Sequence, residues 1–398
     1  MSGQIMAVDH FAGGGGWSVA CRWLGIVEYG VEIMPAAIRT RSANGFRTIY
    51  RDVWSGLFHP SLVPTHRLYI ASPPCQTFSL AGNGEGREAL GDVFQAIDDH
   101  RYEDPARLFE LTKMLDPRTA LVLTPLAHIW QHRPELVALE QVPQVLPVWH
   151  AIAAVLRTIG YSAWVGILSS EMYGVPQTRQ RAILMARLDG VAEPPTPTHS
   201  RYYPLEPHRL DPDVAPWISM ADALGWGMTA RPSLTVTSGG AETGGYEPFP
   251  TNARAAMEKA QRRGDWLIGN QDSQLGATRK RRHSRPVNAP SGTLTATSRS
   301  WKWADRPATT IAADPRITAR EHHEHGEQSK TALTLTRDEA STLQSFPADH
   351  IWRGSKTKQF LQIGNAVPCL LAFAILSALI APPRQRNGWE DVFAEVAL

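Results

Sequence analysis

The chain has 398 residues, of which 43% are hydrophobic and 20% are charged, so a disordered or low-complexity protein is excluded. Its formal charge of +2 is close to neutral. The most apolar stretch, residues 367–380, contains Pro368 and Ser377 and is shorter than the roughly 18 residues of a membrane span. The N-terminus has no basic segment followed by an apolar one, as a secretory signal would have. We therefore expect a cytoplasmic protein without a membrane-spanning segment.

The charge is unevenly distributed along the chain. Residues 251–306 contain 12 Lys and Arg against 4 Asp and Glu, so this segment is strongly basic and the remainder is acidic. Such a segment is suited to an anionic partner. The three cysteines, Cys21, Cys75 and Cys369, form no Cys-x-x-Cys pair. That pattern argues against a zinc ribbon and a disulfide scaffold, and leaves free thiols.

The first half of the chain alternates between strand-like and helix-like segments. Strands are predicted over 5–8, 29–32, 68–71 and 136–139, and helices over 17–24, 35–44, 104–115 and 148–159. Asp104 followed by Pro105 is typical of a helix start. This alternation predicts βαβ units around a mostly parallel sheet.

The pattern changes near residue 190. A proline-rich stretch, 191–198, leads into a turn-rich region that extends to about residue 330, which we interpret as a second, irregular domain. Thr336 and Glu339 have the spacing of a capping box, which predicts a helix through Gln344. The last predicted helix covers 367–380.

The glycine-dense turn after the first strand, residues 13–16, can bring backbone N–H groups and a helix N-terminus close to a nucleotide-like ligand. Glu32, near the end of the second strand, can bind ribose hydroxyls, and Asp52 can face an adenine amino group. Each feature has a plainer interpretation, because glycine runs often form simple turns and single acids are usually surface residues. Together they favour a cofactor site.

Cys75 lies in the sequence Ser-Pro-Pro-Cys-Gln-Thr-Phe-Ser, residues 72–79, which follows a predicted strand. Open α/β sheets place their active sites at the carboxyl ends of strands. A thiol held by two prolines and followed by a glycine-rich loop is positioned as a nucleophile. The alternative is a buried, inert cysteine, which is the commoner fate of a single Cys.

Six motifs occur in an order that resembles the cytosine-C5 DNA methyltransferases of bacteria and phages. They are Phe11-Ala-Gly-Gly-Gly-Gly, Pro74-Cys-Gln-x-Phe-Ser79, Glu140-Gln-Val, Gln177-x-Arg-x-Arg181, Leu343-Gln-x-Phe-Pro347 and Gly364-Asn-Ala-Val-Pro368. The resemblance covers about residues 4–188 and 331–381 and leaves the middle unmatched. It implies a Rossmann-like class I S-adenosylmethionine-dependent methyltransferase domain, of the α/β class, with an inserted, irregular target-recognition domain.

The resemblance also implies a mechanism. Cytosine C5 is a poor nucleophile, so the thiolate at the position of Cys75 adds to C6 and makes C5 enamine-like. Glu140 resembles the carboxylic acid that engages the ring N3 and the exocyclic amine and carries a proton at the critical step. Arg179 and Arg181 alternate along a predicted turn and strand, so both can face one side and help to hold the base. The target cytosine is flipped out of the duplex, and residues 76–100 resemble the mobile loop.

Further residues are carried over with the motifs. The expected cofactor-binding residues are Phe11, Gly13, Gly14, Gly16, Glu32, Ile33, Asp52, Val53, Pro74, Leu108, Asn365 and Ala366, and the cofactor is S-adenosylmethionine. The expected DNA-binding residues are Gln76, Ser79, Gln177, Arg279, Lys280, Arg281, Arg282 and Arg285. Two positions depart from the family pattern: Gln141 stands where most members have Asn, and Ile33 replaces an aromatic that often stacks on adenine.

These matches divide the chain into three parts. Residues 1–190 and 331–398 are expected to build the catalytic domain from both ends of the chain, and 191–330 to form the target-recognition domain. The middle part contains the basic run 279–285 with Trp301 and Trp303 nearby, which suits phosphate and guanine contacts. Its acid- and histidine-rich run, 321–325, is predicted to be a polar loop rather than a metal site. The expected partners are double-stranded DNA and, without a stable complex, a cognate restriction endonuclease; a monomer is expected.

Two other functions are considered. The first is a tRNA cytosine-C5 methyltransferase with the same core; such relatives usually carry a Cys-Phe-Thr motif, whereas Cys369 is followed by Leu-Leu. The second is a DNA-binding protein with a decayed catalytic core. The presence of Cys75, Glu140, Arg179 and Asn365 argues against decay.

Overall fold

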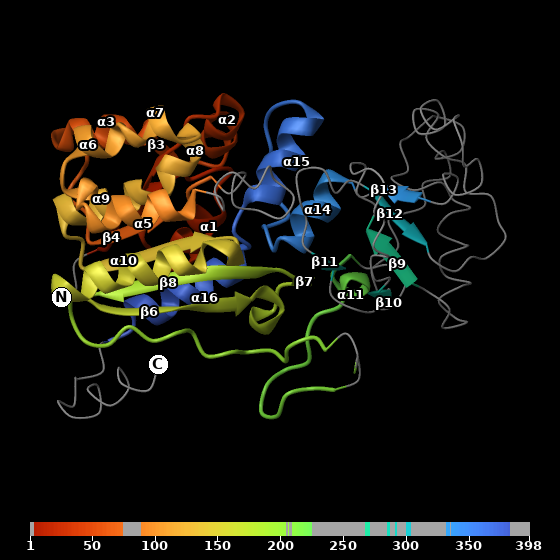
Figure 1. Ribbon diagram of the computed structural model, residues 1–398. Coiled ribbons are helices and arrows are strands. Elements are labelled where there is room, and N and C mark those ends of the chain that lie inside the picture. Colours follow the sequence, from red (N-terminus) through yellow and green to blue (C-terminus); the bar gives the residue numbers. More distant parts are fainter. Residues whose placement is uncertain are drawn as a thin grey trace.

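In the computed structural model the described part of the chain comprises residues 4–74, 89–203, 206, 209–224 and 336–382, together with the short strands β9 to β13. Figure 1 shows a compact α/β unit beside a smaller group of strands. The strands have the bounds β1 Met6–His10, β2 Val27–Val31, β3 Arg47–Tyr50, β4 Leu68–Ala71, β5 Leu136–Gln141, β6 Ser162–Ser169, β7 Gln177–Thr178 and β8 Gln180–Arg187.

The main sheet has seven strands in the order β3-β2-β1-β4-β5-β8-β6. Strands β1 to β5 pair in parallel, and β8 is inserted antiparallel between β5 and β6. The predicted mostly parallel sheet is therefore confirmed. The order reverses at β1, whose neighbours are β2 on one side and β4 on the other, and such a switch point is where open α/β sheets bind ligands.

Each of the four helices predicted in the first half of the chain has a counterpart in the α/β unit, and the structure adds helices over 53–58, 90–98, 117–120 and 124–132 that were not predicted. Their bounds are α1 Gly16–Trp23, α2 Pro35–Ala43, α3 Val53–Phe58, α5 Leu90–Asp98, α6 Pro105–Phe109, α7 Leu111–Met114, α8 Pro117–Ala120, α9 Thr124–His132 and α10 Leu146–Thr158, with 3-10 turns at Pro60–Leu62, Arg101–Glu103, Leu121–Leu123, Pro143–Val145 and Ser170–Tyr173. The predicted helix over 104–115 starts as expected, because the Asp104 side chain accepts from the Ala106 N–H, but it divides into α6 and α7 at Glu110.

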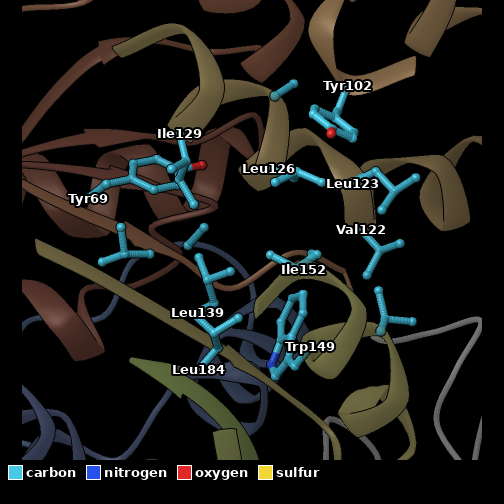
Figure 2. Close-up of a cluster of buried hydrophobic side chains, with 14 of the residues drawn as sticks. Tyr69, Tyr102, Val122, Leu123, Leu126, Ile129, Leu139, Trp149, Ile152 and Leu184 are labelled. Atoms are coloured by element: carbon cyan, nitrogen blue, oxygen red, sulfur yellow. The ribbon is translucent and has the colours of Figure 1, made fainter. Parts of the chain in front are cut away.

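The sheet separates two hydrophobic cores, because successive residues of a strand point to opposite faces. In β5, Val137 and Leu139 belong to one core and Leu136 and Ala138 to the other. Figure 2 shows the first core, in which Trp149 of α10 is fully buried and its indole N–H donates to the Ala182 carbonyl (3.1 Å). The second core is covered by α1 and α16, so the unit has three layers.

The C-terminal helices return to the N-terminal half. They are α14 Arg337–Leu343, α15 Lys356–Asn365 and α16 Cys369–Ile380. The capping box is confirmed, since Thr336 and Glu339 exchange hydrogen bonds between side chain and backbone. The Asn44 side chain, after α2, donates to and accepts from the Ile351 backbone. A side chain at Gly16 would lie 2.3 Å from the Val367 carbonyl oxygen, so only glycine permits this approach.

The stretch Lys356–Ile380 is long and apolar enough to span a membrane by length and composition. Of its most apolar window 61% is buried within the protein. It contains α15 and α16, separated by Ala366–Pro368, and α16 packs into the second core beside α1. This packing is that of a core helix.

The middle region contributes short elements to the described structure. They are α11 Met220–Leu224, β9 Leu267–Asn270, β10 Arg285–Pro286, β11 Ser291–Gly292, β12 Ser300–Trp303 and β13 Ala332–Thr334. Four of them form an antiparallel sheet in the order β10-β9-β12-β13, and β11 pairs with β7. Trp301 and Trp303 lie on β12. The run 321–325 lies outside the described residues.

Four histidines, of which His10 and His128 are fully buried and the other two half-buried, form a cluster between the sheet and α9. The rings of His10, His66, His128 and His132 lie 4.5–5.7 Å from one another in successive pairs. His128 also stacks on Tyr69, with ring centroids 4.0 Å apart. The His10 ring nitrogens lie 3.0 Å from the Tyr69 hydroxyl and 3.3 Å from the Tyr50 hydroxyl. Burial lowers the pKa of His10 to about 3 and of His66 to about 4, and it also lowers the pKa of His128 and His132.

Acid should destabilise the protein through this cluster. The histidines are neutral in the fold but protonate near pH 6.5 once unfolded, so the stability they contribute is complete above pH 6.5 and is lost as the pH falls toward 4. The loss is about 1.4 kcal/mol per pH unit for each fully buried histidine. Urea unfolding at pH 7.5, 6 and 5 measures it. A His128→Gln variant should be less stable than wild type at pH 7.5, but its free energy of unfolding should fall less between pH 7.5 and pH 5. An equal fall in both proteins would contradict the assignment of the acid sensitivity to this cluster.

Candidate active site

The glycine turn lies at the carboxyl end of β1, at the switch point of the sheet. Phe11, Gly13 and Gly15 all have left-handed backbone conformations, with φ of 63°, 55° and 105°. Gly14 and Gly15 are needed for close packing, because a side chain would meet Trp352 at 2.6 Å or Phe46 at 2.9 Å. The turn leads directly into the N-terminus of α1, whose dipole suits an anionic or polar part of a ligand.

The carboxylate of Glu32 holds this turn in place. It follows β2, is buried, and accepts from the Gly13 N–H (2.8 Å) and the Met34 N–H (2.6 Å). Each carboxylate oxygen keeps a second acceptor site, so ribose hydroxyls can still bind. Asp52 is exposed after β3, and its Oδ1 accepts from the Trp54 N–H at the start of α3. The predicted acids thus lie on neighbouring strand ends.

The arrangement fits S-adenosylmethionine. A side chain built at Gly13 would meet nothing closer than 3.9 Å, so a ligand can approach the backbone there. Ile33, beside Glu32, is 67% exposed and offers an apolar surface to an adenine ring. Phe11 is half-buried, and Val53 is buried at the start of α3. The same sheet edge therefore presents a carboxylate, an open glycine and apolar side chains, as an adenosine derivative requires.

The remaining predicted cofactor residues differ in their exposure to solvent, and therefore in their access to a ligand. Pro74, the last described residue before Cys75, is half-buried three residues beyond β4. Asn365 is exposed at the end of α15, and Ala366 is buried next to Val367, which touches Gly16. Leu108 is fully buried in the first core, which leaves it no exposed surface for a ligand.

Glu140 and Arg181 form a nearly buried ion pair. Glu140 is the residue before the last of β5 and is 5% exposed, and its Oε1 lies 2.7 Å from Arg181 Nε on the adjacent strand β8. The antiparallel pairing of β5 with β8 brings these residues together, since Glu140 is opposite Ile183 and Gln141 opposite Ala182. Arg181 also donates to the Gln180 carbonyl (2.7 Å), so the carboxylate is held in a fixed orientation.

Gln141 connects this strand end to the segment that enters Cys75. Its side-chain amide donates to the Pro73 carbonyl (2.6 Å), and its carbonyl oxygen accepts from the Val142 N–H. Gln141 is 2% exposed. The longer side chain that replaces the usual Asn therefore spans from β5 to the proline pair. This contact is the direct link between the Glu140 strand and the predicted nucleophile loop.

Gln177 and Arg179 tie the C-terminal helices to the site. Gln177 is fully buried and donates to the Leu343 carbonyl (3.1 Å) at the end of α14. Arg179, 1% exposed, donates to the Ala366 carbonyl (3.1 Å). Arg179 lies between β7 and β8, so the two arginines make separate contacts: Arg179 supports the Ala366 turn and Arg181 contacts Glu140.

Several predicted residues lie outside the described part of the chain. These are Cys75, Gln76, Ser79, Arg279, Lys280, Arg281 and Arg282. Arg285 lies on β10. The two described cysteines, Cys21 and Cys369, are both fully buried, and burial raises the pKa of each thiol. Neither can therefore act as a nucleophile at the site.

The structure adds residues that sequence reasoning overlooked. Trp352 packs over Gly14, and Ser72 accepts from the Trp17 indole N–H (3.0 Å) just before the proline pair. Asp9, immediately before the turn, is fully buried; burial and the nearby Glu28 raise the pKa of its carboxyl, against the effect of Arg41. Asp9 could have been singled out from its position at a strand end. The Trp352 contact has no local sequence signal.

A doubly wound sheet with a glycine turn and a carboxylate at its switch point is the architecture of an enzyme that binds a nucleotide-like cofactor. The sequence model of the C-5 cytosine-specific DNA methylase family matches residues 110–381. The chain belongs to this family. It is an enzyme that methylates cytosine C5 in DNA and uses S-adenosylmethionine.

Individual relatives span nearly the whole chain. Type II methyltransferase M1.HphI of Haemophilus parahaemolyticus is 26% identical over 95% of this chain and 87% of its own length. Type II methyltransferase M.HgiDI of Herpetosiphon aurantiacus is 27% identical over 95% of this chain and 94% of its own. Solved structures share the fold: the Entamoeba histolytica methyltransferase EhMeth has a TM-score of 0.52 at 15% identity, with 94% of this chain and 98% of that chain covered. The structure of Spodoptera frugiperda DNMT2 has a TM-score of 0.53 at 14% identity, with 94% of this chain and 99% of that chain covered.

Proposed function

We propose that this enzyme methylates one short, specific duplex DNA sequence as the methyltransferase of a type II restriction–modification system. The buried Glu140–Arg181 pair, linked through Gln141 to Pro73, is the observation that carries the catalytic part of the proposal. The similarity to bacterial type II methyltransferases over most of the chain supports the biological part.

The catalytic roles follow from the chemistry of cytosine. Cys75 adds as a thiolate to C6, and electron density moves toward the ring N3, where the Glu140 carboxyl donates a proton or hydrogen bond. Arg181 fixes the orientation of Glu140 through the 2.7 Å contact. Arg179 acts as a positioning residue, because it holds the Ala366 turn. When the cofactor is bound it supplies the methyl group that C5 receives; loss of the C5 proton to a base and departure of the Cys75 thiolate then restore the aromatic ring.

The cofactor is held at the switch point of the sheet. Glu32 binds the ribose hydroxyls, Asp52 faces the adenine amino group, and Ile33 and Phe11 cover the ring. Gly13 lets the methionine part approach the backbone, and Gly14 and Gly16 shape the turn through their close contacts with Trp352 and Val367. Val53, Pro74, Asn365 and Ala366 line the remainder of the site, and Leu108 supports it from the core rather than by contact.

DNA recognition is assigned to the middle of the chain. We assign residues 1–190 and 331–398 to the catalytic domain and 191–330 to the target-recognition domain, to which β13, just past this boundary, is joined by its pairing with β12. Such a division is supported by the return of α14 to α16 onto α1 and α2. In this proposal the basic run 279–285 contacts phosphates and guanine. Gln76 and Ser79 contact the DNA near the flipped base. Gln177 acts indirectly, because it fixes β7 to the end of α14. The protein acts as a cytoplasmic monomer beside a cognate endonuclease that it does not bind stably.

Bisulfite sequencing of DNA from a methylation-free host that expresses this chain tests the function. The expected result is complete protection of one cytosine within one short motif. Scattered protection would contradict sequence specificity. Absence of protection, together with transfer of a labelled methyl group to tRNA, would establish the RNA-directed alternative, and tight DNA binding without transfer would establish a decayed enzyme.

A further inference from the structure

Aromatic side chains from the connection between α14 and α15 pack against the glycine turn. Phe346 and Trp352 are buried, His350 is half-buried, and the centroids of the three rings lie 4.5–4.8 Å from one another. We call these three residues the aromatic cluster. The Trp352 ring would be 2.6 Å from a side chain built at Gly14. Its indole N–H donates to Ser341 Oγ of α14 (3.0 Å), which fixes the orientation of the ring.

The His350 ring is hydrogen-bonded to the backbone of Gly14. Burial, with a smaller effect of Arg22, lowers the pKa of His350 to about 4, although the bond to Gly14 and the charge of Asp349 act in the opposite direction. A hydrogen bond raises the pKa of an imidazole only where the ring donates, so the acceptor is the Gly14 carbonyl. His350 Nε2 is buried without a partner in the described part of the chain, so Nδ1 carries the donated proton. The ring is therefore a neutral donor at pH 7.

Two further side chains support the neighbouring glycines of the turn. Phe46, after α2, would be 2.9 Å from a side chain built at Gly15, and its ring lies 6.4 Å from that of His350. The Glu32 carboxylate accepts from the Gly13 N–H (2.8 Å). Each of the three successive glycines therefore has a separate contact that restricts its position.

The conformation of the turn depends on such contacts. Phe11 has a φ of 63°, in the left-handed region that is unfavourable for a residue with a Cβ. Gly13 and Gly15 also have positive φ, and glycine can leave this conformation easily. A backbone of this kind keeps one conformation only where the surrounding structure imposes it. The aromatic cluster does so at Gly14 and leaves Gly13 open, since a side chain built there would meet nothing closer than 3.9 Å.

We propose that His350 is a positioning residue for S-adenosylmethionine. Its Nδ1–H holds the Gly14 carbonyl while Trp352 packs on the same residue, so the turn has its binding conformation before the cofactor arrives. This inference rests on the proposed placement of the cofactor at the glycine turn. A preorganised turn loses less conformational freedom on binding, so His350 affects the affinity for the cofactor and not the chemistry at the cytosine ring.

Steady-state kinetics of methyl transfer to duplex DNA test this role. His350→Leu removes the donor and keeps an apolar side chain, so the KM for S-adenosylmethionine should rise roughly five- to tenfold while kcat stays within about twofold. His350→Asn places an amide N–H near the position of Nδ1 and should recover most of the affinity. His150→Leu, at an exposed histidine of α10, is the matched control and should change neither constant. A loss confined to kcat would overturn the proposal.

Two further variants keep the test decisive if His350→Leu does not fold. Trp352→Phe keeps an aromatic ring but loses the bond to Ser341, so it should raise the same KM severalfold. Glu32→Gln reports on the placement of the cofactor and should also raise this KM.

The pattern across the variants separates the two proposals. A raised KM in Glu32→Gln, with no change in His350→Leu and Trp352→Phe, would overturn this inference alone. No change in any of the three would overturn the placement of the cofactor at the turn, and this inference with it. A KM raised as much in His350→Asn as in His350→Leu would assign the effect to the ring and contradict the role of the donor.

Discussion

A Cys75→Ser variant is expected to lose methyl transfer by a factor of at least roughly 10³, because a serine hydroxyl stays protonated and adds poorly to C6. Transfer of a labelled methyl group to duplex DNA at saturating S-adenosylmethionine measures the loss. A duplex with 5-fluorocytosine gives a second measure. Fluorine cannot leave C5 as a proton does, so wild type should accumulate a covalent complex that withstands denaturing electrophoresis. The variant should form none.

The chain provides matched controls for this experiment. Cys21 and Cys369 are fully buried, and burial raises the pKa of both thiols, so neither has the surface or the ionisation of a nucleophile. Cys21→Ala and Cys369→Ala should lower stability by about 1–2 kcal/mol, as small cavities do, while transfer per folded molecule and the covalent complex persist. Full activity of Cys75→Ser, or loss of the complex in either control, would refute the assignment.

The elements around the proposed cofactor site were predictable because their signals are local. The strand over 68–71 has the predicted bounds, and helix α1 differs by one residue at each end. Thr336 caps α14 as its spacing with Glu339 indicates. Glu32 was identified from its position at a strand end, and the structure places it against the glycine turn. In each case a hydrogen-bonding side chain or a glycine marks the boundary within a few residues.

The other half of the site depends on pairing that no local pattern encodes. Strand β6 was not predicted, and β8 was anticipated only around residues 177–181, although both are eight residues long. The ion pair between Glu140 and Arg181 exists because β8 enters the sheet antiparallel beside β5. The approach of Val367 to Gly16 joins residues about 350 positions apart. Even Gln141, noted as a departure from the family, showed its contact with Pro73 only in three dimensions.

An Arg181→Ala variant is expected to lose both stability and activity. Glu140, 5% exposed, would lose the guanidinium that lies 2.7 Å away, and removal of one partner from a buried pair costs about 3–5 kcal/mol. Methyl transfer should fall at least roughly 10²-fold, as for loss of a group that orients transition-state contacts. The KM for S-adenosylmethionine should change little, since the proposed cofactor site lies at the ends of β1 and β2. Urea unfolding and steady-state kinetics at 20 °C or below, where the variant is folded, measure the two effects.

The exposed pair of Arg67 with Glu135 is the matched control, because both side chains are about half exposed and the pair lies at the opposite end of β5. Arg67→Ala should cost at most about 1 kcal/mol and leave transfer unchanged. Glu140→Gln/Arg181→Ala completes the test: without either charge it should recover much of the lost stability but none of the activity. Recovery of both would mean that Arg181 only compensates a buried charge. Recovery of stability alone requires that the oriented carboxyl of Glu140 acts on the cytosine ring.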